Sequence, residues 1–291
     1  MPNSESSLFK NFLSVNDFSD HTIKAITHDY QKWIEWFERI NEEQYSSQRV
    51  TIRDVTDFRK HLREERGQAV ATVNRCLVTL RRYFQFLAKK EVIETNPAKG
   101  VKELRRTPTA PKAIERSAVR RLLREATVRE DHRAAAILGL FVYCGLRISE
   151  VSLLKLGDIG LTERRGSLVV RHGKHGKERV VPVPIEVRRM LVSYLASRPA
   201  AETDYIFVGR GLKPLGIDGV RYTVRKYGVA IGLELHPHAL RHTFATQYLE
   251  ANNNDIVGLA QILGHESIQT TSRYTQRGES QLSEASEMVT F

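Results

Sequence analysis

Four short motifs in the second half of the 291-residue chain carry side chains that could act on a phosphate. They read GLRISE, GKHGKERVV, HPHALRHT and LGHESIQTTSRYT, and they begin at residues 145, 173, 236 and 263. Their candidate residues are Arg147, Glu150, Lys174, Lys177, His238, Arg241, His265 and Tyr274. This set is rich in hydrogen-bond donors and poor in carboxylates. Guanidinium groups bind the non-bridging oxygens of a phosphodiester and stabilise the charge that grows in its transition state. The set therefore predicts metal-free phosphoryl transfer.

Arg147 and Glu150 stand three residues apart, directly after the apolar run AAAILGLFVYCGL that begins at Ala134. An exposed ion pair at this spacing contributes only tenths of a kcal/mol, about 0.2–0.5, and a surface pair is one interpretation. A guanidinium at the end of an apolar segment needs a partner, however. Glu150 could hold Arg147 in orientation while its other donors face a ligand.

The two lysines lie in or beside the tip of a predicted hairpin, where a long ammonium side chain could reach a phosphate. A solvated charged turn is the alternative interpretation. The motif lacks the G-x-x-x-x-G-K-[ST] spacing of a P-loop, which argues against nucleotide hydrolysis.

His238 and Arg241 are three residues apart on a predicted helix, so they share a face. The histidines at 236, 238 and 242 invite a zinc interpretation, but H-E-x-x-H is absent and no cysteine pair lies nearby. His242 could equally be a packing residue. Because acidic clusters are also absent, we expect no metal and no cofactor.

Tyr274 could be a half-buried packing residue with a solvated hydroxyl. With a reference pKa of about 10, a tyrosine is a poor nucleophile unless nearby cations favour its phenolate or a base takes its proton. The cations of the other motifs could provide this support. Attack on DNA would leave a phosphotyrosyl link.

Composition favours a globular protein with a polyanionic partner. Hydrophobic residues make up 41% and charged residues 27% of the chain, and the formal net charge is +11. Two cysteines cannot form a disulfide framework and fit a reducing compartment. The start of the chain lacks a secretory signal pattern, and the longest apolar run is too short to cross a bilayer. We therefore expect a cytoplasmic, nucleoid-associated protein without a membrane partner.

Helical periodicity dominates the first hundred residues. Apolar stripes predict helices over 21–37, 51–62 and 71–90, with inward residues that include Ile52, Val73, Leu77 and Phe84. Prolines 108 and 111 interrupt a basic stretch, so residues 105–113 are interpreted as a linker. We expect a helical domain over 1–104, a second domain over 114–279 and a tail over 280–291.

The second domain is predicted to begin with a helix capped by Ser117, followed by a buried helix over 133–144. SLVVRHGKHGKERVVPVP then reads as a hairpin, and DYIFVG as one more short strand. The fold class is thus mainly α with a small antiparallel β-sheet.

The four motifs, in this order and at this spacing, resemble the tyrosine recombinase (lambda integrase-like) family, and most closely its Xer-type and integron- or transposon-integrase branches. The resemblance spans nearly the whole chain. It implies a SAM-like core-binding domain and a catalytic domain that form a C-shaped clamp on DNA. It also implies a 3′-phosphotyrosyl intermediate and a Holliday junction.

By position, Arg147 and Arg241 resemble the family's catalytic arginines, and Glu150 the acidic residue that supports the first. Lys174 resembles the hairpin lysine that protonates the leaving 5′ oxygen, with Lys177 the weaker candidate. His238 and His265 match the family's two histidines, and Tyr274 matches its nucleophile.

The resemblance further implies a duplex with an inverted-repeat core site and a homotetramer on DNA, with a second recombinase or accessory protein as a possible partner. Leu282, Ala285 and Met288 or Val289 recur at helical spacing, so the tail either docks on a neighbouring protomer or is a frayed end. The candidate DNA-binding residues are Arg75, Arg81, Arg82, Lys89, Arg105, Arg106 and Lys177. Polar residues near 216–230 are candidate base readers.

Three other functions explain less of the pattern. A type IB topoisomerase shares the tyrosine chemistry, but the separate helical domain and the tail favour a recombinase. A catalytically silent DNA-binding accessory protein would not need the intact set of catalytic residue types. A basic RNA-binding scaffold explains none of the motif order. The biological role, from chromosome dimer resolution to integration of a mobile element, stays open at this point.

Overall fold

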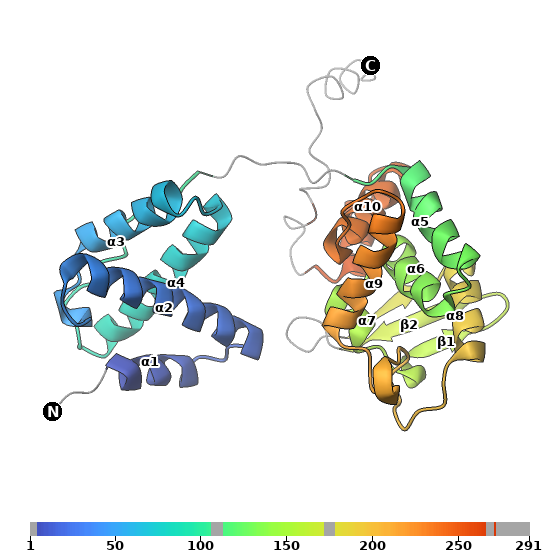
Figure 1. Ribbon diagram of the computed structural model, residues 1–291, viewed down its shortest axis with the longest axis horizontal. Coiled ribbons are helices and arrows are strands. Elements are labelled where there is room, and N and C mark those ends of the chain that lie inside the picture. Colours follow the sequence, from blue (N-terminus) through green and yellow to red (C-terminus); the bar gives the residue numbers. More distant parts are fainter. Residues whose placement is uncertain (1–4, 106–112, 172–177, 266–270, 272–291) are drawn as a thin grey trace, which may run out of the picture. The chain divides into compact units, whose positions relative to one another are not determined.

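The computed structural model describes residues 5–105, 113–171, 178–265 and 271 of the chain. The chain divides into two compact units, Met1–Pro108 and Thr109–Phe291. Each unit has its own hydrophobic core, and Figure 1 shows the elements that surround each core. Mainly helical structure with a small antiparallel sheet was predicted, and this is confirmed.

The first unit is entirely helical over its described residues. Its elements are α1 (Glu5–Ser14), α2 (Asp20–Asn41), the 3-10 turn η1 (Ser47–Arg49), α3 (Ile52–Lys60), the π-helical turn η2 (His61–Glu65) and α4 (Val70–Lys89). The core is rich in aromatic rings: Phe9 of α1 stacks on Tyr30 of α2 with ring centroids 3.8 Å apart, and Trp33 is fully buried. Phe9 also meets Tyr83 of α4 edge-on, so α1 is fixed against both α2 and α4 (Figure 1).

The predicted helical stripes lie in this core, with one exception. Val73, Leu77 and Phe84 of α4 are at most 1% exposed. Ile52, which was predicted to face inward, is 55% exposed, so that prediction was wrong. It is the first residue of α3, before the helix meets the core, and the end of its side chain lies beside Gly100. Helix α1 was not predicted.

The second unit surrounds a buried helix. Its helical elements are α5 (Arg116–Val128), α6 (His132–Cys144), α7 (Ile148–Ser152), η3 (Leu156–Asp158), α8 (Ile185–Ser197), η5 (Arg210–Leu212), α9 (Ile217–Ala230), α10 (Pro237–Ala251) and α11 (Ile256–Leu263). Residues 134–142 of α6 are all buried, because α5, α8, α9 and α10 surround this helix (Figure 1). The predicted buried helix is confirmed. It ends at Gly145, whose φ of +62° is the left-handed conformation that glycine adopts most readily.

The sheet contains β1 (Ile159–Leu161), β2 (Gly166–Val170) and β3 (Arg179–Pro182), antiparallel and in that order. β2 and β3 form the predicted hairpin, with Val170 opposite Arg179, while β1 was not predicted. The strand predicted at 204–209 is wrong. That segment makes only isolated bridges, at Tyr205 and Val208, because Arg198 and other groups outside the sheet take its backbone hydrogen bonds.

The predicted helix cap at Ser117 is also wrong. Helix α5 begins at Arg116 and its N-cap residue is Glu115. Ser117 therefore lies inside the first turn, and its hydroxyl donates to a carboxylate oxygen of Glu115 at 3.2 Å. Within the described residues, no helix is long and apolar enough to cross a membrane.

Candidate active site

The candidate site is built around the buried carboxylate of Glu150 on α7. Its side chain is 1% exposed, and its oxygens accept hydrogen bonds from the guanidinium groups of Arg147 and Arg179. One oxygen also accepts the backbone N–H of Arg147, at 2.8 Å. Burial raises the pKa of Glu150, but the hydrogen bonds and charges of Arg179, and then those of Arg147, lower it to about 2. Glu150 is therefore an ionised anchor at neutral pH.

Three arginines from three different elements meet at this carboxylate. Arg147 is the N-cap residue of α7 and donates from Nη1 to Oε1 of Glu150 at 2.8 Å. Arg179, the first residue of β3, donates to both carboxylate oxygens, each at 2.8 Å. Nη1 of Arg241, on α10, lies 3.8 Å from Oε2. Three positive charges against one negative charge leave an excess that suits an anionic ligand.

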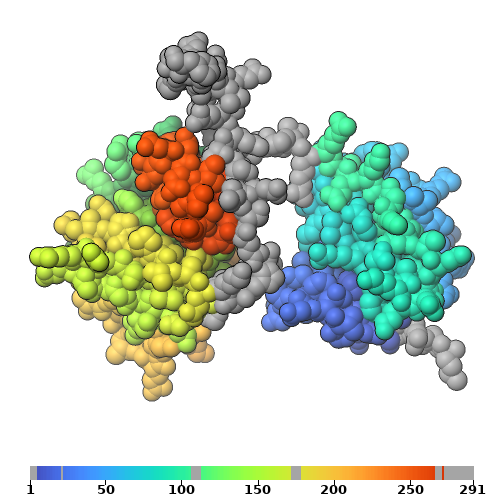
Figure 2. All heavy atoms as spheres, turned by 180° about the vertical axis from the view of Figure 1, so that it is seen from behind, coloured from blue at the N-terminus to red at the C-terminus, as the bar shows by residue number. Residues whose placement is uncertain are grey.

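The same three arginines hold the C-terminal end of α11. Arg179 donates to the carbonyl of Ile262 at 2.7 Å, Arg241 to that of Leu263 at 2.9 Å, and Arg147 to that of Gly264 at 3.2 Å. The last carbonyls of a helix lack intrahelical partners and carry the negative end of its dipole. Cationic donors are therefore well suited to this position. Figure 2 shows the orange-red segment that includes α11 beside the segment that includes β3.

Arg241 also donates to the carbonyl of Gly145 at 2.5 Å, which joins the end of α6 to the end of α11. The close packing of this turn against α10 requires glycine at 145, because a Cβ there would lie 2.3 Å from Cδ1 of Phe244. The guanidinium of Arg241 is fixed by the ends of two helices. Its side chain is only 5% exposed.

His265 follows directly after the end of α11. Its ring nitrogens lie 3.3 Å from Nη2 of Arg241 and 2.8 Å from the hydroxyl of Thr271. Gly264 has a φ of +62° and turns the chain so that His265 meets Arg241. The structure thus brings Arg147, Glu150, Arg241 and His265 together.

His238 is exposed near the start of α10, one turn before Arg241. Its ring lies 4.2 Å from that of His242, between ring centroids, in an edge-to-face arrangement. Among the described residues no group of three or more His, Cys, Asp or Glu could hold a metal ion.

Three site candidates, Lys174, Lys177 and Tyr274, lie outside the described residues, as does Arg106. Arg179 was not selected from the sequence. Its only signal was a cation at the start of a β-branched run. The sequence does not distinguish such a residue from a solvated one. The strand register does, because it places Arg179 opposite the buried Val170.

The cations predicted to bind DNA in the first unit differ in their partners. Arg81 donates to the carboxylate of Glu103 and to the carbonyl of Val101, each at 3.1 Å. Arg75 donates to the buried Asp29 at 2.8 Å. In contrast, Arg82, Lys89 and Arg105 are exposed and form no hydrogen bond or ion pair with any residue in the described ranges.

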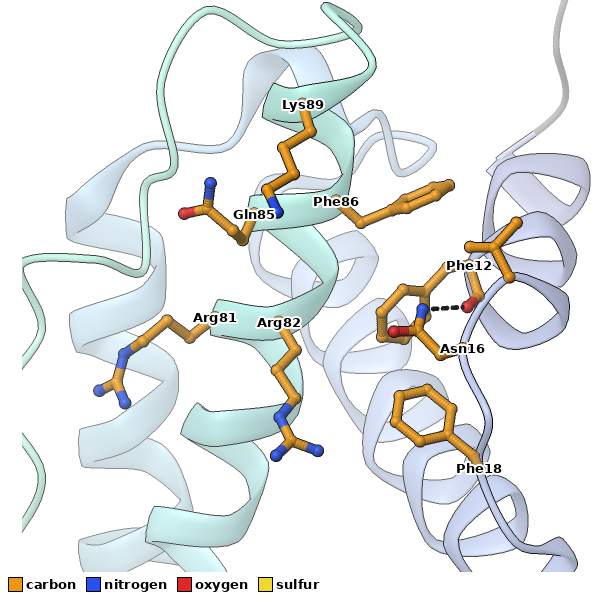
Figure 3. Close-up of a pocket in the computed structure, with 9 residues that line it drawn as sticks. Phe12, Asn16, Phe18, Arg81, Arg82, Gln85, Phe86 and Lys89 are labelled. Atoms are coloured by element: carbon orange, nitrogen blue, oxygen red, sulfur yellow. Dashed lines mark hydrogen bonds between the residues drawn. The ribbon is translucent and has the colours of Figure 1, made fainter.

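Arg75, Arg82 and Lys89 follow one another at intervals of seven residues, so they share one face of α4. Arg82, Gln85 and Lys89 border a hollow of about 610 Å³, and Phe86 points across it toward Phe12 of α1 (Figure 3). This face combines exposed cations with an aromatic floor.

Comparisons with known proteins agree with this architecture. Residues 112–281 match the phage integrase family, and residues 7–91 match the N-terminal SAM-like domain of phage integrases. The tyrosine recombinase XerA of Thermococcus kodakarensis is 34% identical over 280 residues, which cover 94% of this chain and 91% of that protein. The tyrosine recombinase XerC of Pseudomonas fluorescens is 31% identical over 268 residues, which cover 90% of this chain and 87% of that protein.

Solved structures show the same fold. The crystal structure of XerH bound to palindromic difH substrate, a post-cleavage complex, gives a TM-score of 0.78 at 20% identity over 99% of this chain and 85% of that chain. A crystal structure of XerA recombinase gives a TM-score of 0.55 at 25% identity over 98% of both chains.

The two units are therefore a SAM-like domain and a phage integrase catalytic domain, and the chain belongs to the phage integrase family of tyrosine recombinases. Its similarity to recombinases of the Xer group extends over nearly its full length.

Proposed function

We propose that this protein is a site-specific recombinase that cuts and rejoins DNA through a 3′-phosphotyrosyl intermediate and a Holliday junction. The observation that carries the proposal is the group of three guanidinium groups around the ionised Glu150, with His265 against Arg241. The positive charge of this group suits a phosphodiester, and guanidinium donors can stabilise its transition state without a metal ion.

In this proposal Arg147 and Arg241 bind the non-bridging oxygens of the scissile phosphate, and Glu150 keeps Arg147 in orientation. His265 and His238 donate hydrogen bonds to the same phosphate. The phenolic oxygen of Tyr274 forms a bond to phosphorus and gives its proton to solvent water. The bond from phosphorus to the 5′ oxygen breaks as Lys174 protonates that oxygen. Attack by a 5′-hydroxyl of the partner duplex reverses these steps.

The proposal extends to DNA binding and assembly. The domains over 1–104 and 114–279, joined by the basic linker over 105–113, would form a clamp around an inverted-repeat site. Arg82, Lys89 and Arg105 are the candidate phosphate contacts of the first unit, since none of them is paired with a described residue. Lys177 and Arg106 would add to these contacts. Four protomers would assemble on two sites in the nucleoid of the cytoplasm, with or without a second recombinase.

Covalent capture on DNA tests the central step. The protein is mixed with nicked fragments of its own source DNA in the presence of EDTA, the mixture is denatured, and DNA that stays attached to protein is sequenced. We expect adducts at a discrete inverted repeat, and a Tyr274→Phe variant that binds the same sequence without linking to it. Adducts without sequence preference would favour a topoisomerase. Specific binding without adducts, even with a candidate partner recombinase added, would favour a DNA-binding accessory protein.

The tail over 280–291 is proposed to dock on a neighbouring protomer. Its apolar residues recur at helical spacing, and the segment lies outside the described residues. A chain that ends at residue 279 should bind one site normally and assemble less tetramer on paired sites, as measured by native gel shift. Unchanged tetramer formation would contradict docking.

A further inference from the structure

We propose that Arg179 is a positioning residue for phosphoryl transfer, which locks Glu150 to the end of α11 so that Arg147 and His265 face the scissile phosphate correctly. This inference rests on the proposed function and adds a residue to its site. Arg179 was not predicted as part of the site, and its contacts differ from those of the other two arginines.

Arg179 donates to the protein from all three of its guanidinium nitrogens. Nη1 and Nη2 bind the two oxygens of Glu150, each at 2.8 Å, and Nε binds the carbonyl of Ile262 at 2.7 Å. This is the forked, two-point geometry that only arginine provides. Glu150 and the carbonyl of Ile262 thus engage all three nitrogens of the guanidinium, and the side chain of Arg179 is 12% exposed.

Arg147 has the complementary geometry. It uses Nη1 for Glu150 and Nη2 for the carbonyl of Gly264, and its side chain is 34% exposed. Since a guanidinium has five N–H donors, several remain for a phosphate. Arg179 occupies both oxygens of Glu150, which limits Arg147 to a single hydrogen bond from its guanidinium to that carboxylate.

Arg179 also fixes the segment that leads to His265. A Cβ on Gly264 would lie 2.9 Å from Nη1 and 3.0 Å from Cδ of Arg179, so the turn packs directly against this side chain. Along the chain Arg179 follows Lys174 by five residues, and Tyr274 follows His265 by nine. One side chain therefore joins the strand after the lysine to the turn before the histidine and tyrosine.

Loss of the two-point bond between Arg179 and Glu150 should change the orientation of Arg147 while the positive charge of the site is kept. When Arg179 is replaced by lysine, the positive charge stays but only one donor group can reach Glu150. The freed carboxylate oxygen then becomes available to a second N–H of Arg147. A two-point bond between Arg147 and Glu150 would turn the guanidinium away from the phosphate.

A matched control is available on the same hairpin. Arg171, directly after β2, donates to the buried Asp158 at 2.5 Å and is not part of the site. Arg171→Lys weakens another arginine pair with a buried carboxylate on the same hairpin, although Arg171 makes a single hydrogen bond to Asp158 and is more exposed than Arg179. Any general loss of hairpin stability should thus appear in both variants.

The experiment measures the rate of covalent adduct formation on a synthetic nicked duplex of the captured sequence, at saturating protein. Wild type, Arg179→Lys and Arg171→Lys are compared on a duplex with a normal scissile phosphate and on one with a neutral methylphosphonate there. The methylphosphonate lacks the charge that Arg147 stabilises. Rates are divided by the folded fraction, obtained from thermal unfolding of each variant.

We expect the rate of adduct formation by Arg179→Lys to fall at least tenfold on the phosphate duplex. On the methylphosphonate duplex the fall should be several-fold smaller. Arg171→Lys should stay within twofold of the wild-type rate on both duplexes. An equal loss on both duplexes, or an equal loss in both variants, would assign Arg179 a merely structural role. An unchanged rate would also overturn the inference. Should Arg179→Lys fail to fold, Arg179→Gln is measured in the same way, with the same ratio as readout. Absence of adducts with wild-type protein would instead contradict the proposed function.

Discussion

Glu150 shows at the residue scale how one buried charge organises a site. A buried carboxylate is strongly destabilised unless it is paired and hydrogen-bonded. Here three arginines and a backbone N–H surround it, and the same arginines bind the last carbonyls of α11. Orientation of Arg147 and placement of His265 thus depend on one carboxylate.

The pH dependence of stability should reveal this anchor. The pKa of Glu150 is lowered from 4.5 to about 2 in the folded protein, so its contribution to stability is complete above pH 4.5 and is lost as the pH falls toward 2. The difference in unfolding free energy between wild type and Glu150→Gln should therefore shrink as the pH falls from 4.5 to 2. Urea unfolding at several pH values measures it.

Glu64 provides the control. Its side chain is 62% exposed, and its one ion pair is long, with 3.9 Å between Oε2 of Glu64 and Nζ of Lys60. Glu64→Gln should show little difference from wild type at any pH in this range. If the difference in unfolding free energy between wild type and Glu150→Gln stays constant from pH 4.5 to 2, the ionised form of Glu150 does not stabilise the fold.

Residue types and spacing predicted the pairing of Arg147 with Glu150, and the shared face of His238 and Arg241. They could not predict Arg179. Cations at the start of a strand are common, and only the fold shows that this one turns inward to α7 and α11.

At the scale of elements, helix ends do much of the positioning. Gly145 ends α6, and its carbonyl accepts a hydrogen bond from Arg241 on α10. Gly264 ends α11 and directs His265 toward the same arginine. Helices α2, α3 and α4 were predictable because their apolar periodicity matches the core they bury, whereas α1 was not predicted. The segment over 204–209 was mistaken for a strand because its apolar run is buried, although its hydrogen bonds go elsewhere.

Replacement of Gly145 tests this role. In Gly145→Ala the new Cβ would meet Phe244 at 2.3 Å in a residue with a φ of +62°. Left-handed strain of about 1–2 kcal/mol and overpacking of about 1–3 kcal/mol should both lower the unfolding free energy. Chemical denaturation measures the loss.

Gly232→Ala is the matched control, because its φ is +76° and a Cβ there would meet nothing within 4 Å. It should show only the left-handed strain. Equal losses in the two variants would mean that close packing against α10 does not require glycine at 145.

Helix α4 offers a second test, on DNA binding. Arg82 makes no hydrogen bond or ion pair with any described residue, whereas its neighbour Arg81 binds Glu103 and the carbonyl of Val101. Arg82→Gln should weaken DNA binding and lower the slope of log K against log salt by about 1, with little change in stability. Arg81→Gln should mainly lower the stability of the first unit. Binding isotherms at several salt concentrations, together with thermal unfolding, measure both effects, and the reverse pattern would contradict the assignment.

On the scale of the whole molecule, two units with separate cores share a formal charge of +11. Helical periodicity and the proline-interrupted linker predicted the two-domain plan, and the motif order predicted the family. The positions of Lys174 and Tyr274 in the site remain predictions, because both lie outside the described residues.

The residue of the protein that links to DNA can be identified on the captured adduct. The captured adduct is digested with protease and nuclease in EDTA, and the peptide that carries the remaining nucleotide is sequenced by mass spectrometry. We expect a single phosphotyrosyl peptide in which Tyr274 is joined to a 3′-phosphate. A link through another residue, a link to a 5′-phosphate, or adducts that form only with a divalent metal would contradict it.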